Sequence, residues 1–150
     1  MMTLTFLLMT QPTVHLAPPR PLRDAVSIRY QPGTTAPLRL VETLLRCAAM
    51  LKKSAPWSTP LQLRVVHQRW LDRQFGTVKN HHRRGRYYPS RRGHQSLIYL
   101  ADGRDASISL AHEWIHHLAS VYNEDWTEAY VEQQAQRCAS GVLSPEPTSP

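Results

Sequence analysis

The chain has 150 residues, about the length of one domain, and its 41% hydrophobic and 19% charged residues exclude a wholly disordered protein. No apolar run reaches the roughly 18 residues that a transmembrane helix needs, so we expect no membrane partner. The apolar stretch at residues 4–9 lacks the basic start and the cleavage site of a signal peptide. These features predict a cytoplasmic protein.

Charge is distributed unevenly along the chain, which has a net charge of +7. Residues 1–100 carry 16 basic and 3 acidic side chains, whereas residues 101–150 carry 2 basic and 8 acidic ones. The basic part is compatible with binding to nucleic acid. The acidic part indicates a separate role for carboxylates, such as metal binding.

The chain contains two cysteines, Cys47 and Cys138, and both lie inside amphipathic helical patterns. So few cysteines exclude a disulfide-rich scaffold, and we expect both thiols to be reduced, as in the cytoplasm. Neither cysteine has a neighbouring partner that would suggest a structural zinc site.

Residues 1–36 contain five prolines and read as a leader that is extended in part, with a strand at 27–30. Apolar residues then recur every three or four positions, which predicts a helix over 37–54. Alternation predicts a half-buried strand over 61–66, and a short helical turn over 69–75 ends at Gly76.

The segment 79–93 carries six basic residues among tyrosines, glycines and proline, and we interpret it as a loop or a hairpin tip. An apolar strand follows at 96–100. The next helix has Asp105 or Ser107 as its N-cap and an apolar face formed by Ile108, Ala111, Ile115, Leu118 and Tyr122. After a turn at 123–124, a capping box of Asp125 and Glu128 opens a last helix that ends near residue 140. We expect residues 142–150 to be a disordered tail.

The first of these two helices contains the sequence His112-Glu113-Trp114-Ile115-His116, an HExxH motif. Residues four apart share one face of a helix, so the imidazoles of His112 and His116 can bind one zinc ion. Glu113 lies about 100° further round and can act as the general base on a water molecule. The helix is predicted independently by its apolar face, which makes a chance match improbable.

With this motif the chain resembles the zincin metallopeptidases, and among them the gluzincins of the small, single-domain kind called minigluzincins. The resemblance covers roughly residues 96–141. It implies that the third zinc ligand is a glutamate on the following helix. It also implies that the strand at 96–100 forms the upper edge of the cleft and pairs with an extended substrate.

Two glutamates compete for the role of third ligand. Glu128 and Glu132 resemble the ExxxD/E pattern of many gluzincins, in which the first acid binds the metal and the second supports a ligand histidine. Alternatively, residues 123–128 resemble the NExxSD pattern of thermolysin-like enzymes, in which Glu124 binds the metal. Glu124 follows His116 by only eight residues and falls in the turn, so spacing favours Glu128.

Other polar residues near the motif have weaker assignments. His117 points about 100° away from His116, so we expect a surface or supporting role rather than metal binding. The metzincin pattern is excluded because residues 118–122 contain neither the glycine nor the third histidine that it needs. His94, Tyr122 and Tyr130 are candidates for stabilising an oxyanion.

The sequence therefore predicts an α+β fold with a small sheet, a backing helix and two zinc-bearing helices, confined to residues 37–141. The predicted function is zinc-dependent peptide hydrolysis, with Glu113 catalytic and with His112, His116 and Glu128 as zinc ligands. The alternative is a basic nucleic-acid-associated protein with a structural or inactive zinc site. The segment 79–93 would contact the phosphates, and Tyr87 and Tyr88 would stack on bases.

Overall fold

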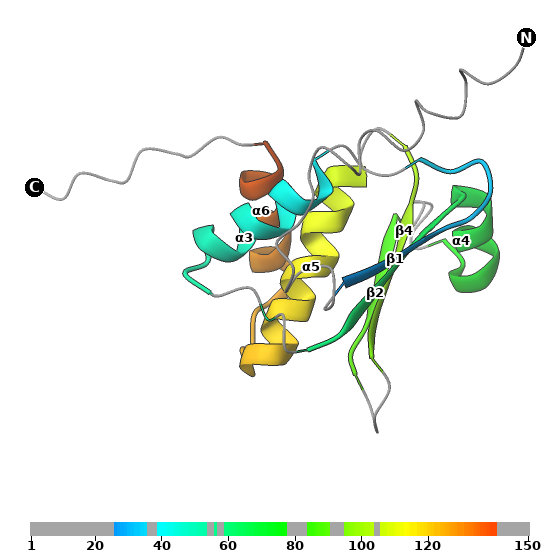
Figure 1. The fold of residues 1–150 in the computed structure, drawn as a ribbon. Helices are drawn as coiled ribbons and strands as arrows, with labels where there is room; N and C mark the ends of the chain where they lie inside the picture. Colours follow the sequence, from blue (N-terminus) through cyan, green and yellow to red (C-terminus); the bar gives the residue numbers. More distant parts are fainter. Residues whose placement is uncertain are drawn as a thin grey trace, which may run out of the picture.

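The computed structural model describes residues 26–35, 39–53, 56, 59–77, 84–90, 95–103 and 106–140. The leader before residue 26, the tail after residue 140 and most of the basic segment 79–93 lie outside these ranges. The described part is a mixed α+β fold in which one sheet separates the helices (Figure 1). Its elements are β1 (Val26–Tyr30), α3 (Leu40–Met50), β2 (Leu61–Val66), α4 (Gln68–Phe75), β3 (Gly85–Tyr88), β4 (Ser96–Ala101), α5 (Ala106–Tyr122) and α6 (Glu128–Ser140).

The sheet has four strands in the order β1-β2-β4-β3. Strands β1, β2 and β4 run parallel to one another, and β3 pairs with β4 in the antiparallel direction. The strands expected at 27–30, 61–66 and 96–100 are confirmed. Residues 85–88 of the basic segment, which was expected to be a loop or a hairpin tip, form the strand β3, and β3 pairs with β4 at the edge of the described sheet.

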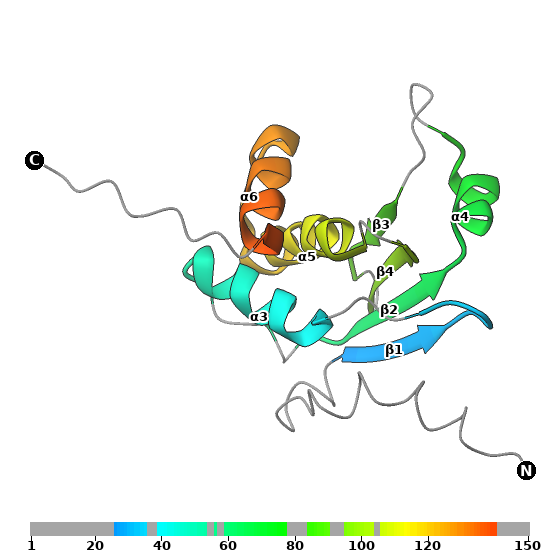
Figure 2. The same cartoon turned by 90° about the horizontal axis from the view of Figure 1, so that it is seen from above.

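Helices α3, α5 and α6 cover one face of the sheet, and α4 lies on the opposite face (Figure 2). Most of the core lies beneath α5, because Leu63, Ile98 and Leu100 of the sheet are buried against Trp114 and Ile115. A second, smaller cluster consists of Val66, Leu71 and Ala101 under α4. Because helices cover both faces, β2 is buried along most of its length rather than half-buried as expected.

Three details of the helices differ from the sequence-based expectations. Ile108 is 40% exposed, since the buried face of α5 is shifted toward Leu110 and Trp114. Ser107 lies inside α5, so it cannot be its N-cap, and Asp105 is outside the described residues. At α6 the hydroxyl of Thr127 accepts a hydrogen bond from the backbone N–H of Tyr130, which places Thr127, not Asp125, at the N-cap.

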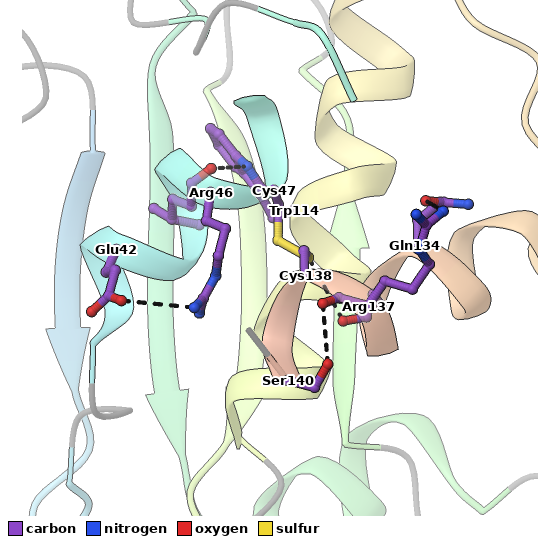
Figure 3. The surroundings of a disulfide bond; sticks show 10 residues. Glu42, Arg46, Cys47, Trp114, Gln134, Arg137, Cys138 and Ser140 are labelled. Atoms are coloured by element: carbon purple, nitrogen blue, oxygen red, sulfur yellow. Dashed lines mark hydrogen bonds and ion pairs between the residues drawn. A yellow bond between two sulfur atoms is a disulfide. The ribbon is translucent and has the colours of Figure 1, made fainter. Parts of the chain in front are cut away.

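The expectation that both cysteines are reduced is wrong. Cys47 of α3 and Cys138 of α6 form a disulfide that spans 91 residues of sequence (Figure 3). Trp114 of α5 lies beside it, and its indole N–H donates a hydrogen bond to the carbonyl oxygen of Leu44. Disulfides are typical of oxidising compartments, so the prediction of a cytoplasmic setting loses the support that reduced thiols would provide. No described helix has the length and apolar character needed to cross a bilayer.

Candidate metal centre

Helix α5 places His112 and His116 on one face, one turn apart. Their Nε2 atoms are 3.1 Å apart. The buried positions of α5 run from Ala106 to Leu118, and they include Ala111 and Ile115 directly before each of the two histidines. The same packing that holds α5 on the sheet therefore fixes both imidazoles at its margin.

Helix α6 brings a carboxylate to the two imidazoles. Glu128 Oε1 is 2.8 Å from His112 Nε2, and Glu128 Oε2 is 3.3 Å from His116 Nε2. One donor atom from each of the three residues lies within 4.8 Å of the others. The Glu128 side chain is 71% exposed, so the cluster opens to solvent on one side.

The donor set has the chemistry and spacing of a zinc site. Zinc takes nitrogen and oxygen ligands at about 2.0–2.2 Å in a tetrahedral arrangement, which separates the ligand atoms by about 3.3 Å. The 3.1 Å between the two Nε2 atoms is close to that value, and one oxygen of Glu128 lies near each imidazole, at 2.8 Å from His112 and 3.3 Å from His116. Two imidazoles and one carboxylate, with a side open to solvent, fit a catalytic zinc site better than a closed structural one.

Glu132 lies behind His112, one turn after Glu128. Its Oε2 atom is 3.1 Å from His112 Nδ1, the ring nitrogen that faces away from the cluster. A carboxylate in this position fixes the tautomer and the orientation of a metal-binding histidine. This contact is the one that the ExxxD/E resemblance implies for the second acid.

Glu124, the alternative third ligand, lies elsewhere. Its carboxylate pairs with the ammonium group of Lys53. Its backbone N–H bonds to the carbonyl oxygen of Ala119 where Asn123 adopts a left-handed conformation and ends α5. The turn thus directs Glu124 toward α3, and Glu128 is the acid that meets the histidines.

The general-base candidate, Glu113, is held between α5 and the edge strand. It is 8% exposed and lines a cavity of about 290 Å³ together with the histidines, Glu128 and the β3 residues Gly85, Arg86 and Tyr87. A Cβ atom at Gly85 would lie 2.7 Å from Glu113 Cγ and 2.8 Å from Glu113 Oε1. Glycine is therefore required at this position for the carboxylate to occupy its place.

The strand that borders the cavity is β3, which corrects the assignment of that role to residues 96–100. Strand β4 is an interior strand with β2 and β3 on its two sides. Gly85 and Arg86 were not predicted as cavity residues, because the density of basic residues suggested a loop. Residues 85–88 show no alternation of apolar and polar side chains, and the local signal for a strand is weak: two adjacent tyrosines before Pro89.

Burial and charge affect the two adjacent histidines differently. Burial lowers the pKa of His116, the nearby His112 lowers it further, and Glu128 opposes both effects. Burial lowers the pKa of His117 to about 4. The lowered pKa values favour the neutral form of both imidazoles. For His116, the neutral form is the one that can bind a metal.

His117 is fully buried, not on the surface. It stacks against Trp114, with ring centroids 5.2 Å apart, and its Nδ1 atom is 3.3 Å from the hydroxyl of Tyr87. It is not part of the metal cluster. Its role in the structure is to join α5 to the rim strand β3.

Of the three oxyanion candidates, the two that the structure describes do not lie with the cluster. Tyr122 lies under the Lys53 ammonium group at 5.1 Å, and Tyr130 packs against the ring of Trp126. Neither lines the cavity. His94 is outside the described residues.

Comparison of the chain with protein families, with curated proteins and with solved structures finds no match. The geometry of the cluster is therefore the basis for a functional proposal.

Proposed function

We propose that this protein is a zinc-dependent metallopeptidase of the gluzincin kind. The observation that carries the proposal is the convergence of His112, His116 and Glu128 from two helices, with Glu113 beside them in one cavity. His112 and His116 would hold the ion through Nε2, and Glu128 through its carboxylate. A zinc ion bound there would supply a Lewis acid with an open coordination position.

The remaining chemistry belongs to the residues of the chain. The Glu113 carboxylate accepts a proton from the attacking water molecule and later delivers a proton to the leaving nitrogen. Its burial between α5 and β3 holds the carboxylate in place and limits competition from solvent. Glu132 keeps the ring of His112 oriented through Nδ1.

Strand β3 is the proposed site of substrate binding. Among the described strands it has a single neighbour, β4, so its other edge offers backbone N–H and C=O groups. An extended peptide can add to such an edge as a further strand. Gly85, Arg86 and Tyr87 border the cavity, and a peptide paired with β3 would pass over Glu113 and the histidines.

The alternative, a structural zinc site in a nucleic-acid-associated protein, has less support. Structural sites close all four positions with protein ligands, usually including cysteine. Both cysteines here are joined to each other in the disulfide.

The test combines metal analysis with peptide hydrolysis. We expect one zinc ion per chain, lost in His112→Ala and retained in a matched control, His67→Ala, whose histidine lies at the start of α4. Glu113→Gln should retain zinc and lose turnover. Wild-type zinc content in both His112→Ala and His116→Ala, or full turnover in Glu113→Gln, would exclude the proposal.

A further inference from the structure

The face of the sheet opposite α5 presents a row of cationic and aromatic side chains. One line of paired residues crosses all four strands, from Arg29 through Arg64 and Tyr99 to Arg86. Residues paired across strands point to the same side of a sheet. Of the described helices, α4 is the one on this side (Figure 2).

Aromatic rings surround this row. Trp70 and Phe75 of α4 lie 5.1 Å and 5.6 Å from the ring of Tyr99, measured between centroids. The guanidinium of Arg64 lies 5.6 Å from the Tyr99 ring centroid, and that of Arg86 lies 5.5 Å from the ring of Tyr88. The face is therefore an arginine–aromatic surface, formed by Arg29, Arg64, Trp70, Phe75, Arg86, Tyr88 and Tyr99.

The positive charge of this surface is not balanced within the described part of the chain. No described carboxylate lies within 4.0 Å of the guanidinium groups of Arg29, Arg64 or Arg86. Arg64 instead donates hydrogen bonds to Gln62 and to the hydroxyl of Tyr99. Three guanidinium groups without nearby acids favour an anionic partner.

A hollow of about 300 Å³ lies in the surface, lined in part by Arg29, Arg64, Trp70 and Tyr99. Cationic groups and ring faces thus border the same space. A single planar, aromatic and anionic unit could place its ring against Trp70 or Tyr99 and its charge against Arg29 or Arg64.

We propose that the arginine–aromatic surface binds single-stranded nucleic acid, with the arginines on phosphates and a base in the hollow against Trp70 and Tyr99. Single-strand binders combine a cationic track with aromatic side chains on which bases stack. An acidic peptide would satisfy the arginines but would make no use of the ring faces. A duplex keeps its bases stacked on each other, so it cannot fill the hollow in this way.

This inference does not depend on the proposed peptidase activity, because the hollow at Trp70 and Tyr99 and the cavity at Glu113 lie on opposite faces of the sheet and have no lining residue in common. Arg86 of the edge strand borders the cavity and also belongs to the arginine–aromatic surface. It also differs from a phosphate-binding loop at 79–93. Arg86 and Tyr88 of that segment belong to the arginine–aromatic surface, whereas Tyr87 points toward His117 beside the cavity.

The test measures binding of labelled, mixed-sequence single strands of about 15 nucleotides, DNA and RNA, to the full chain by fluorescence anisotropy. At about 50 mM salt, Arg29→Gln/Arg64→Gln should raise Kd by about 25- to 100-fold and reduce the salt slope by about 1.4. Lys52→Gln/Arg137→Gln, which removes two exposed charges from the helical side, is the matched control and should change Kd by no more than about twofold.

Two further variants distinguish specific binding of the strand from a folding defect and from attraction by charge alone. Arg29→Gln, at an exposed position of β1, should raise Kd by about 5- to 10-fold without affecting the packing around Tyr99. Trp70→Leu should raise Kd by about 5- to 150-fold with an unchanged salt slope, because it removes stacking and not a phosphate contact.

Three results would overturn the proposal. The first is no binding of either single strand at about 50 mM salt. The second is an equal loss in the control pair, which would show that net charge alone attracts the strand. The third is binding of poly-glutamate as tightly as the oligonucleotide with no effect of Trp70→Leu, which would assign the surface to acidic peptides.

Discussion

Glu128 and Glu132 lie one turn apart on α6 and approach opposite nitrogen atoms of His112. We expect Glu128→Ala to reduce zinc affinity about as much as His116→Ala, because each removes a direct ligand. Glu132→Ala should cost about 10- to 100-fold, because His112 loses only its orientation. Zinc dissociation constants from competition with a chelator provide the measurement.

Glu124→Ala is the matched control for these variants. It breaks the partly buried ion pair with Lys53, so we expect unchanged zinc affinity and a loss of stability of about 1 kcal/mol or less. A larger loss of zinc affinity in Glu124→Ala than in Glu128→Ala would show that the assignment of the third ligand is wrong.

The side chain of Glu113, the general-base candidate, occupies the space that a Cβ atom at position 85 would need. Gly85→Ala should displace the Glu113 carboxylate and reduce turnover, by roughly 100-fold for a shift of about 1 Å. Zinc content should stay at the wild-type level, because the atoms that an added Cβ would meet first belong to Glu113, which is not a ligand. Turnover close to wild type would mean that Glu113 can move without consequence and would contradict its proposed role.

His117 should make the metal-free protein sensitive to acid. Its pKa is lowered to about 4 in the folded chain, against about 6.5 when unfolded, so below pH 6.5 the unfolded chain binds the proton more readily. Its contribution to stability is complete above pH 6.5 and is lost as pH falls toward 4, to a total of about 3 kcal/mol. Urea unfolding of the wild type and of His117→Gln in the presence of chelator, at several pH values, measures this contribution.

The expected result is a wild-type curve that falls more steeply with decreasing pH than the His117→Gln curve. The comparison cancels the other histidines, which are present in both proteins. Parallel curves between pH 7 and pH 4 would show that His117 is not held neutral by its burial.

At the scale of the elements, α6 carries Glu128 and Glu132 and is attached to α3 by the Cys47–Cys138 disulfide (Figure 3). A crosslink that closes a loop of about 90 residues stabilises a protein by about 2–5 kcal/mol, chiefly by restricting the unfolded chain. We expect Cys47→Ser/Cys138→Ser to lower the free energy of unfolding by this amount, as measured in urea.

The same variant should also bind zinc less tightly, because α6 loses its covalent attachment while α5 keeps its core contacts. Reduction of the wild type with a thiol reagent should reproduce both effects, and treating the double variant in the same way is the control. Unchanged stability on reduction would indicate that the two thiols are not paired in solution.

Strand β3 illustrates why elements are harder to predict than motifs. Its four residues contain one glycine, one arginine and two tyrosines, and only the pairing with β4 makes them a strand. Strand β2 was expected to be half-buried because Arg64 and Gln62 alternate with leucine and valine. Its burial instead depends on α4, which covers the second face of the sheet.

At the scale of the whole molecule, metal binding should be coupled to folding, since the three ligands come from two helices that meet only in the folded chain. At a free zinc concentration of about 100 times Kd, the free energy of unfolding should rise by about 2.7 kcal/mol. Thermal or urea unfolding with zinc and with chelator measures the difference.

Glu113→Gln should show the same stabilisation by zinc, because its side chain is not a ligand. Glu128→Ala should show less at the same zinc concentration. Equal stability of the wild type with zinc and with chelator would argue against a specific metal site.

The sequence by itself determined the features that depend on local geometry. The four-residue spacing of His112 and His116 places two imidazoles on one face of any helix, and the apolar positions Ala111, Ile115 and Leu118 make that helix a core element. The strands at 61–66 and 96–100 and the turn at 123–124 likewise follow from alternation, from a short apolar run and from turn chemistry.

Only the tertiary structure decided the features that depend on how separate elements pack. The partner of Cys47 lies 91 residues away, and both cysteines resemble small apolar core residues in a helical pattern. Whether Glu124 or Glu128 meets the histidines depends on the path of the five-residue connection between α5 and α6, which directs Glu124 to Lys53. The row from Arg29 to Arg86 exists because four strands align in one register, and no local pattern encodes that alignment.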